Sequence, residues 1–325
     1  MKKFIVKLII FLLIVLNLHL LLYAPTGIDV PKNILLTDMY IANQPEIIYL
    51  GDSSLFTSTP QDKDKRSIPE MLQELLPQYS MGSIMHEAYN MSNYLHFCRY
   101  MIRKEYRPKI VIVPITMRTF SPHWDMRPSW QFEKEKLFLL CNNSVLLHIF
   151  YKPLAILKLF QQRITQYDFD NTPVFNGDRP AGRIIDYINP TYATPSEQNI
   201  KNKLILRYMF PLSARHRKMK SLIELATLLK IHDIQILFYI PPIDYQTGEQ
   251  YLSGAFRERM VKNTSLVKSL LAGMGVEVLD LSFSLESDSF SWRDDSYPYP
   301  NEHLREASRQ FIAQQLSQTL QKYNP

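Results

Sequence analysis

The sequence predicts an α/β domain built on a mostly parallel sheet of five strands, doubly wound in the flavodoxin-like manner, with helices on both faces. Runs such as "KIVIVPI" (109–115) are apolar and β-branched without polar alternation, which is typical of strands buried on both faces. Between such runs lie segments with an apolar stripe at helical spacing. Hydrophobic residues make up 46% of the 325 residues, enough for one large core. Strands that alternate with helices predict crossover connections and therefore a parallel sheet.

The predicted elements follow in chain order. We expect strands at 46–50, 86–92, 109–115, 234–240 and 276–281. Helices are expected at 67–78, 94–106, 219–232, 256–274 and 304–323. The first of these helices has a capping-box sequence, with Ser67 as the N-cap and Glu70 three residues later.

The chain divides into a tip and apolar segment (1–23), a connector (24–45) and the α/β domain (46–325), which carries an insertion at about 119–217. The insertion includes a stretch at 137–162 that reads as two helices. It follows the third strand, so it is expected near the carboxyl edge of the sheet, where ligands bind. Two interpretations stay open for it, a substrate-binding lid or a packed helical decoration.

The amino terminus predicts a membrane anchor. A helix from Phe4 to Tyr23 would be about 30 Å long, matching the hydrocarbon thickness of a bilayer. Lysines at the amino-terminal side (Lys2, Lys3 and Lys7) favour a cytoplasmic N-terminus, with the main domain on the extracytoplasmic side, periplasmic or extracellular. A cleaved signal peptide is the alternative, although the apolar stretch is long for one.

The stretch "IIYLGDSSLFTSTP" (47–60) places Gly-Asp-Ser-Ser directly after a buried strand. A small-residue corner at a strand end can present a reactive serine, or it can be an inert turn. A serine nucleophile needs a base, and His303 lies between the fifth strand and the last helix. The carboxyl ends of strands one and five open on the same edge of a doubly wound sheet, so Ser53 and His303 are a candidate pair.

Strand-GDS near the start and a histidine followed by leucine at the last helix resemble the SGNH, or GDSL-like, family of serine esterases and acyltransferases. The resemblance covers the chain from about Glu46 to its end, outside the insertion. It implies that Ser53 is the nucleophile and His303 the base.

Three family positions differ in this chain. The acid three residues before the histidine is replaced by Pro300, so the orienting role passes to Asp294, Asp295 or Glu302, of which we favour Asp295. The oxyanion glycine of the second block is missing, and a backbone amide from Ser92 or Asn93 would have to substitute for it. In place of the asparagine after the third strand, the sequence offers Thr116 and Arg118 as hydrogen-bond donors.

The sequence also bears on whether nucleic acids, metals or sugars are partners of this chain. The net charge of +6 is modest and spread along the chain, which does not indicate nucleic-acid binding. The histidines show no metal-ligand spacing, so we expect no metal and no cofactor. Trp124 and Trp130 are candidates for stacking on a sugar ring, with helix packing as the alternative.

Together these features predict a membrane-anchored, extracytoplasmic serine esterase or O-acyltransferase of the SGNH type, acting on acyl esters of cell-envelope glycans. Its expected partners are the membrane, a cell-envelope glycan or acyl donor, and a membrane acyltransferase. The alternative is a catalytically degenerate SGNH-like envelope protein that binds a glycan or a membrane acyl-transfer partner. A lipid-acting esterase is a third hypothesis.

Overall fold

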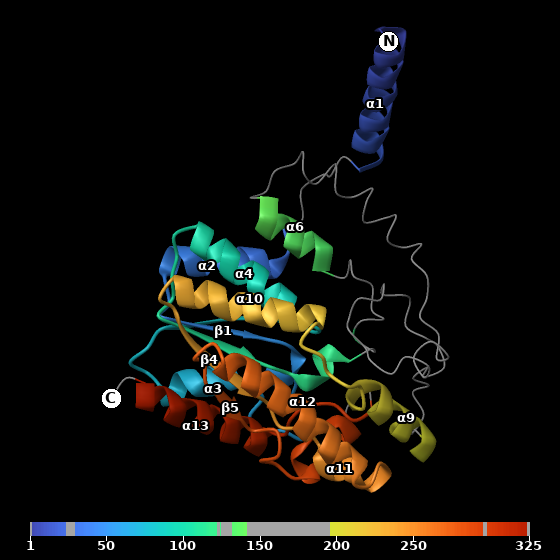
Figure 1. Cartoon of the computed structure of the whole chain (residues 1–325). Helices are drawn as coiled ribbons and strands as arrows, with labels where there is room; N and C mark the ends of the chain where they lie inside the picture. Colours follow the sequence, from blue (N-terminus) through green and yellow to red (C-terminus); the bar gives the residue numbers. More distant parts are fainter. Residues whose placement is uncertain are drawn as a thin grey trace.

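The computed structural model describes residues 2–23, 30–121, 124, 132–141, 196–294 and 298–323. Its centre is a five-stranded sheet with the strand order β2-β1-β3-β4-β5, in which all neighbouring strands are parallel (Figure 1). The strands are β1 (Ile47–Gly51), β2 (Met81–Met85), β3 (Ile110–Pro114), β4 (Gln235–Ile240) and β5 (Val278–Asp280). This is the flavodoxin-like doubly wound order. The predicted parallel sheet is confirmed.

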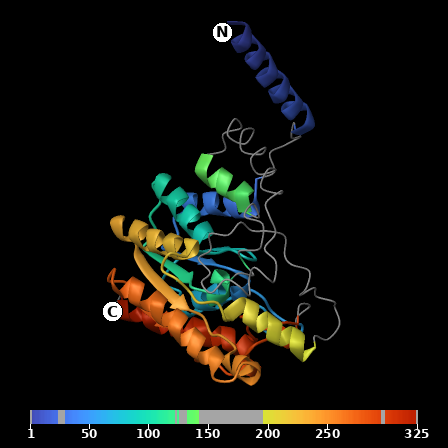
Figure 2. The same cartoon turned by 45° about the vertical axis from the view of Figure 1, so that its right-hand side comes forward.

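Helices cover both faces of the sheet (Figures 1 and 2). In β1, Ile48 and Leu50 point to one core, while Ile47 and Tyr49 point to the other. The first core is closed by α2 (Lys32–Asn43), α4 (Met91–Arg103), α10 (Arg217–Ile231) and α12 (Ala255–Ala272). The second is closed by α3 (Ile68–Leu75) and α13 (Glu306–Tyr323). Because β1 and β3 are buried on both sides, their sequences are apolar throughout.

The capping box predicted for the first helix is present. Ser67 is the N-cap of α3, its hydroxyl accepts a hydrogen bond from the Glu70 amide, and the Glu70 carboxylate accepts one from the Ser67 amide. α3 is shorter than predicted and ends at Leu75.

The second predicted strand was placed wrongly. The strand β2 is Met81–Met85, whereas 86–92 form a turn and the start of α4, with Asn90 as its N-cap. β2 lies at the edge of the sheet and is only alternately buried. Its sequence "MGSIM" has a single β-branched residue, which explains why the local pattern did not reveal it.

Further elements lie outside the predicted set. α2 falls in the predicted connector and packs against β2. Within the predicted insertion, the structure describes η2 (Met117–Phe120), α6 (Glu133–Cys141) and α9 (Glu197–Tyr208). Most of the predicted two-helix stretch and Trp130 lie outside the described residues. The described residues also form the short elements η1 (Ser53–Leu55), α11 (Tyr245–Tyr251), η6 (Ser287–Ser289) and η7 (Trp292–Asp294).

The predicted membrane anchor is not supported. Across the described part of the chain, no helix combines the length and the apolar character that a membrane crossing requires. The anchor prediction fell on α1 (Lys2–Tyr23), which is helical. The transmembrane part of the predicted fold and the single-pass localisation derived from it are therefore corrected.

Candidate active site

The corner after β1 separates the roles of its two serines. Asp52 is the N-cap of η1 and is buried, and its Oδ1 accepts hydrogen bonds from the Ser54 amide (2.9 Å) and the Ser54 hydroxyl (2.7 Å). Ser54 is therefore buried and donates to the N-cap residue Asp52. Ser53 is only partly buried, and its Oγ lies 3.1 Å from Nε2 of His303. The structure thus brings together the two residues that the sequence paired.

Gly51 allows the tight corner. A Cβ at this position would lie 1.9 Å from Cδ1 of Leu55, because η1 folds the buried Leu55 side chain back over the end of the strand. A side chain at position 51 would push Leu55 away and disturb the turn that holds Ser53.

His303 is held through its backbone on both sides. Its amide donates to Oδ1 of Asn301 (2.8 Å), and its carbonyl accepts from the Ser291 amide (2.9 Å). The next residue, Leu304, forms an antiparallel bridge with Phe290. These contacts fix the backbone from which the imidazole reaches Ser53.

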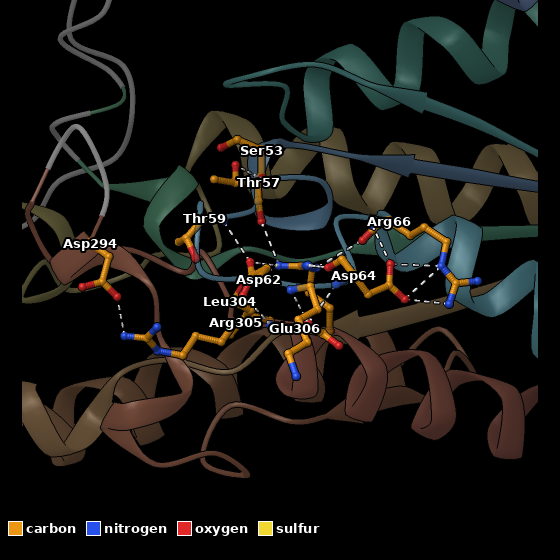
Figure 3. A network of polar contacts seen from close by, with 12 residues as sticks. Ser53, Thr57, Thr59, Asp62, Asp64, Arg66, Asp294, Leu304, Arg305 and Glu306 are labelled. Atoms are coloured by element: carbon orange, nitrogen blue, oxygen red, sulfur yellow. Dashed lines mark hydrogen bonds and ion pairs between the residues drawn. The ribbon is translucent and has the colours of Figure 1, made fainter.

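A buried guanidinium joins the segment after Ser53 to the segment after His303. Arg309 in α13 is 0% exposed. It donates to the Asp62 carboxylate (3.0 Å) and to the carbonyls of Leu304 (2.8 Å), Asp64 (2.6 Å), Arg66 (3.2 Å) and Thr57 (3.3 Å). Thr57 in turn donates its hydroxyl to the carbonyl of Ser53 (2.7 Å). Figure 3 shows this network between Ser53 and the segment that carries Leu304.

Asp62 is held in its charged form by the same network. Its carboxylate also accepts from the amides of Thr59 (2.8 Å) and Glu306 (3.2 Å), the latter in the first turn of α13. Burial by itself raises the pKa of Asp62, but these amides and the Arg309 guanidinium outweigh it and lower the pKa below the ordinary value.

The three carboxylates considered as the orienting acid have different positions. Asp294 forms an ion pair with Arg305 (2.5 Å), as Figure 3 shows. Glu302 is buried and forms an ion pair with Arg118 (2.7 Å), while its other oxygen accepts from the Tyr208 hydroxyl (2.7 Å). Asp295, the favoured candidate, lies outside the described residues.

The predicted backbone oxyanion donors are engaged elsewhere. The Ser92 amide donates to Oδ1 of Asn90 (3.0 Å), and the Asn93 amide donates to the Asn90 carbonyl (2.8 Å). Asn93 completes this cap by accepting from the Asn90 amide through Oδ1 (3.3 Å). Its Nδ2 is used in none of the hydrogen bonds of the described residues, so the side chain, not the backbone, is what Asn93 can offer a ligand.

Thr116 and Arg118 follow β3, the strand beside β1. Thr116 is 1% exposed, and within the described part of the chain its Oγ1 has no hydrogen-bond partner. A buried hydroxyl without a partner is costly, so such a group is often completed by a ligand or water. Arg118 is buried against Glu302, and its guanidinium carbon lies 5.5 Å from the ring centroid of Trp124.

Sequence reasoning missed several residues that support the site, namely Asp62, Tyr208, Asn301 and Arg309. Asn301 had a local signal, because an asparagine two residues before His303 is placed to accept from the His303 amide in an Asx turn. The other three act across long sequence separations and left no local pattern.

A surface cleft of about 470 Å³ lies away from these residues. It is lined by Glu46 and Lys109, which precede β1 and β3, and by neighbouring residues. It is therefore at the amino ends of the strands, whereas Ser53 follows the carboxyl end of β1. We do not include it in the site.

The sequence matches no protein-family model and none of the curated proteins. Among solved structures, a catalytic mutant of Axe2, an acetylxylan esterase from Geobacillus stearothermophilus, aligns with a TM-score of 0.41 at 10% identity, over 84% of this chain and 93% of that chain. A carbohydrate acetylesterase family member from Sinorhizobium meliloti aligns with a TM-score of 0.37 at 8% identity, over 85% and 98%. Because these scores and identities are low, the function of this chain has to be argued from its own residues.

Proposed function

We propose that this protein is a serine esterase in which Ser53 is the nucleophile and His303 the general base. The observation that carries the proposal is the 3.1 Å contact between Ser53 Oγ and His303 Nε2 at the carboxyl edge of a parallel sheet. A serine hydroxyl is a weak nucleophile by itself and becomes reactive when a base within hydrogen-bond reach accepts its proton.

In the proposed reaction, His303 Nε2 takes the proton of Ser53 as Oγ bonds to the acyl carbonyl carbon. The tetrahedral intermediate collapses, the bond to the alcohol oxygen breaks, and His303 returns the proton to that oxygen. Water then attacks the acyl-enzyme with His303 again acting as base, which releases the acid and restores Ser53. An acceptor hydroxyl in place of water would give acyl transfer. We assign the orienting role to Asp295, since Asp294 and Glu302 have the other partners described above.

The negative oxygen of the intermediate needs hydrogen-bond donors. We assign this role to the Thr116 hydroxyl, which is buried and lacks a partner within the described residues. The Asn93 side-chain amide is the second proposed donor. Arg118 is reassigned from the oxyanion to the support of Glu302, because its Nε lies 2.7 Å from that carboxylate.

For the substrate we propose an acyl ester of a carbohydrate hydroxyl. Trp124 supports this choice, because it is only partly buried and lies beside Arg118 just after β3. An indole ring can stack on a sugar ring.

The test is mass spectrometry of the full chain after treatment with a fluorophosphonate probe, with Ser53→Ala and His303→Ala treated in parallel. We expect one adduct on Ser53 in the wild type, no adduct in Ser53→Ala, and a strongly reduced adduct in His303→Ala. Hydrolysis of an acetylated oligosaccharide is then measured with and without an acceptor glycan. An unlabelled wild type that is folded by circular dichroism would contradict the proposal.

A second function is a glycan-binding protein that has lost catalysis. The observation in its favour is that the amides of Ser92 and Asn93, which were expected to serve the oxyanion, are used to cap α4. If this function is correct, a glycan binds equally well to the wild type and to Ser53→Ala, and neither protein releases acid from its esters.

A further inference from the structure

The segment before His303 is fixed by a buried carboxylate that no catalytic step uses. The Glu302 side chain is 1% exposed. Its Oε2 lies 2.7 Å from Nε of Arg118, and its Oε1 accepts from the Tyr208 hydroxyl at 2.7 Å. Three separate parts of the fold therefore meet at the residue next to His303: η2, α9 and the segment that carries His303.

The charges explain why this arrangement is rigid. A buried carboxylate is costly unless a counter-charge and hydrogen-bond donors lie beside it, and here Arg118 supplies the charge and Tyr208 the hydrogen bond. Burial, and next to it the negative charge of Glu302, raise the pKa of Tyr208 well above its ordinary value, so the hydroxyl keeps its proton and remains a donor. Moving Glu302 would break both contacts together, and the His303 backbone would move with it.

α9 holds the same segment at two further points. The Arg207 guanidinium donates to the carbonyl of Pro300, and the Lys203 ammonium lies 5.0 Å from the ring centroid of Tyr299. Arg309 holds the far side of His303 through the carbonyl of Leu304. The histidine thus lies between two anchors, α13 on its carboxyl side and α9 on its amino side.

We propose that Tyr208 is a positioning residue, which acts through Glu302, with Arg118 as its counter-charge, to keep His303 within reach of Ser53. This inference rests on the proposed function of Ser53 and His303. It assigns a role to α9, an element within the insertion, in the reaction itself. Small displacements of a catalytic group reduce rates steeply, because the reacting atoms must stay within hydrogen-bond distance.

The test compares two variants, each of which lacks a tyrosine hydroxyl that donates a hydrogen bond to a carboxylate. Tyr208→Phe loses the bond to Glu302, whereas the ring and its edge contact with Phe256 stay. The matched control is Tyr100→Phe, which loses a bond of the same length (2.7 Å) to Asp38, on the helices α4 and α2. The readouts are the labelling rate of Ser53 by the fluorophosphonate, kcat and KM for a small acetate ester, and the imidazole nitrogen NMR signals of His303.

We expect Tyr208→Phe to lower the labelling rate and kcat by about tenfold or more with little change in KM, and to shift or broaden the His303 signals. Tyr100→Phe is expected to stay within about twofold of the wild type. Glu302→Gln, which keeps the shape but removes the charge, should show the same pattern as Tyr208→Phe.

Equal effects in Tyr208→Phe and Tyr100→Phe, or none in either, would overturn the positioning role. Failure of the proposed function looks different, because then the wild type itself is not labelled. In that case the NMR signals still decide whether Tyr208 holds the imidazole, since they require no activity.

Discussion

Arg309 and Asp62 form an ion pair of 3.0 Å in which the two side chains are 0% and 5% exposed. The pair connects α13 to the loop between Ser53 and α3, and the same guanidinium binds the carbonyl next to His303. The buried Arg309 guanidinium therefore contacts both the loop that follows Ser53 and the segment that follows His303.

Replacing Arg309 by methionine is expected to destabilise the protein strongly. The substitution leaves the Asp62 carboxylate buried without its cation, and breaking one side of a buried ion pair costs about 3–5 kcal/mol. Urea unfolding followed by circular dichroism measures the loss. The labelling rate of Ser53 should fall as well in the fraction that remains folded, because the loop and the His303 segment lose their common support.

The control for this prediction is Arg66→Ala in the neighbouring pair with Asp64, where Arg66 is 45% exposed. Exposed ion pairs contribute little, so its unfolding midpoint should stay close to that of the wild type. Similar losses in Arg66→Ala and Arg309→Met would show that burial of the Asp62 pair is not what matters.

Asp62 should also make the free energy of unfolding depend on pH in the acidic range. Its folded-state pKa is lowered, so its ionisation stabilises the protein fully above the unfolded pKa, and this contribution is lost as the pH falls through the folded pKa. The effect is expected below about pH 4. Asp62→Asn cannot titrate, so its unfolding free energy should fall less steeply in this range. Urea titrations at several pH values test this, and parallel curves for the two proteins would contradict it.

Local patterns in the sequence were enough to predict the parallel sheet, apart from the position of β2, and to predict that Ser53 and His303 lie close together. Buried β-branched runs identified β1, β3 and β4, and the common edge of parallel strands placed Ser53 near His303. The long-range polar contacts of the site could not be predicted in this way. Asp62 and Arg309 are 247 positions apart, and Tyr208 and Glu302 are 94 apart, so their contact depends on how whole helices pack. Arginine is mostly solvent-exposed in proteins, so the residue type of Arg309 gave no sign that it is buried.

The two serines at the corner should respond differently to alanine. Ser54→Ala removes the 2.7 Å bond to Asp52 but leaves Ser53 and His303 in place. We expect Ser54→Ala to keep the fluorophosphonate adduct and to lose about 1 kcal/mol of stability. Peptide mapping of the adduct separates the two positions. An adduct that survives in Ser53→Ala and disappears in Ser54→Ala would reverse their roles.

Gly51 should be sensitive even to the addition of one methyl group. In Gly51→Ala the new Cβ would meet the Leu55 side chain at 1.9 Å, and Leu55 is 1% exposed in the core beneath α3 and α13. Overpacking of this kind costs about 1–3 kcal/mol. Because Leu55 belongs to the same turn as Ser53, the labelling rate should fall together with stability.

The control for Gly51→Ala is Gly273→Ala at the end of α12, where the nearest atoms to a new Cβ are two carbonyl oxygens at 3.5 Å, an ordinary contact. Gly273→Ala should unfold and react nearly as the wild type does. If Leu55 instead rotates freely to accept the methyl group, Gly51→Ala will match this control in both measurements. The tight corner would then not be what sets the position of Ser53.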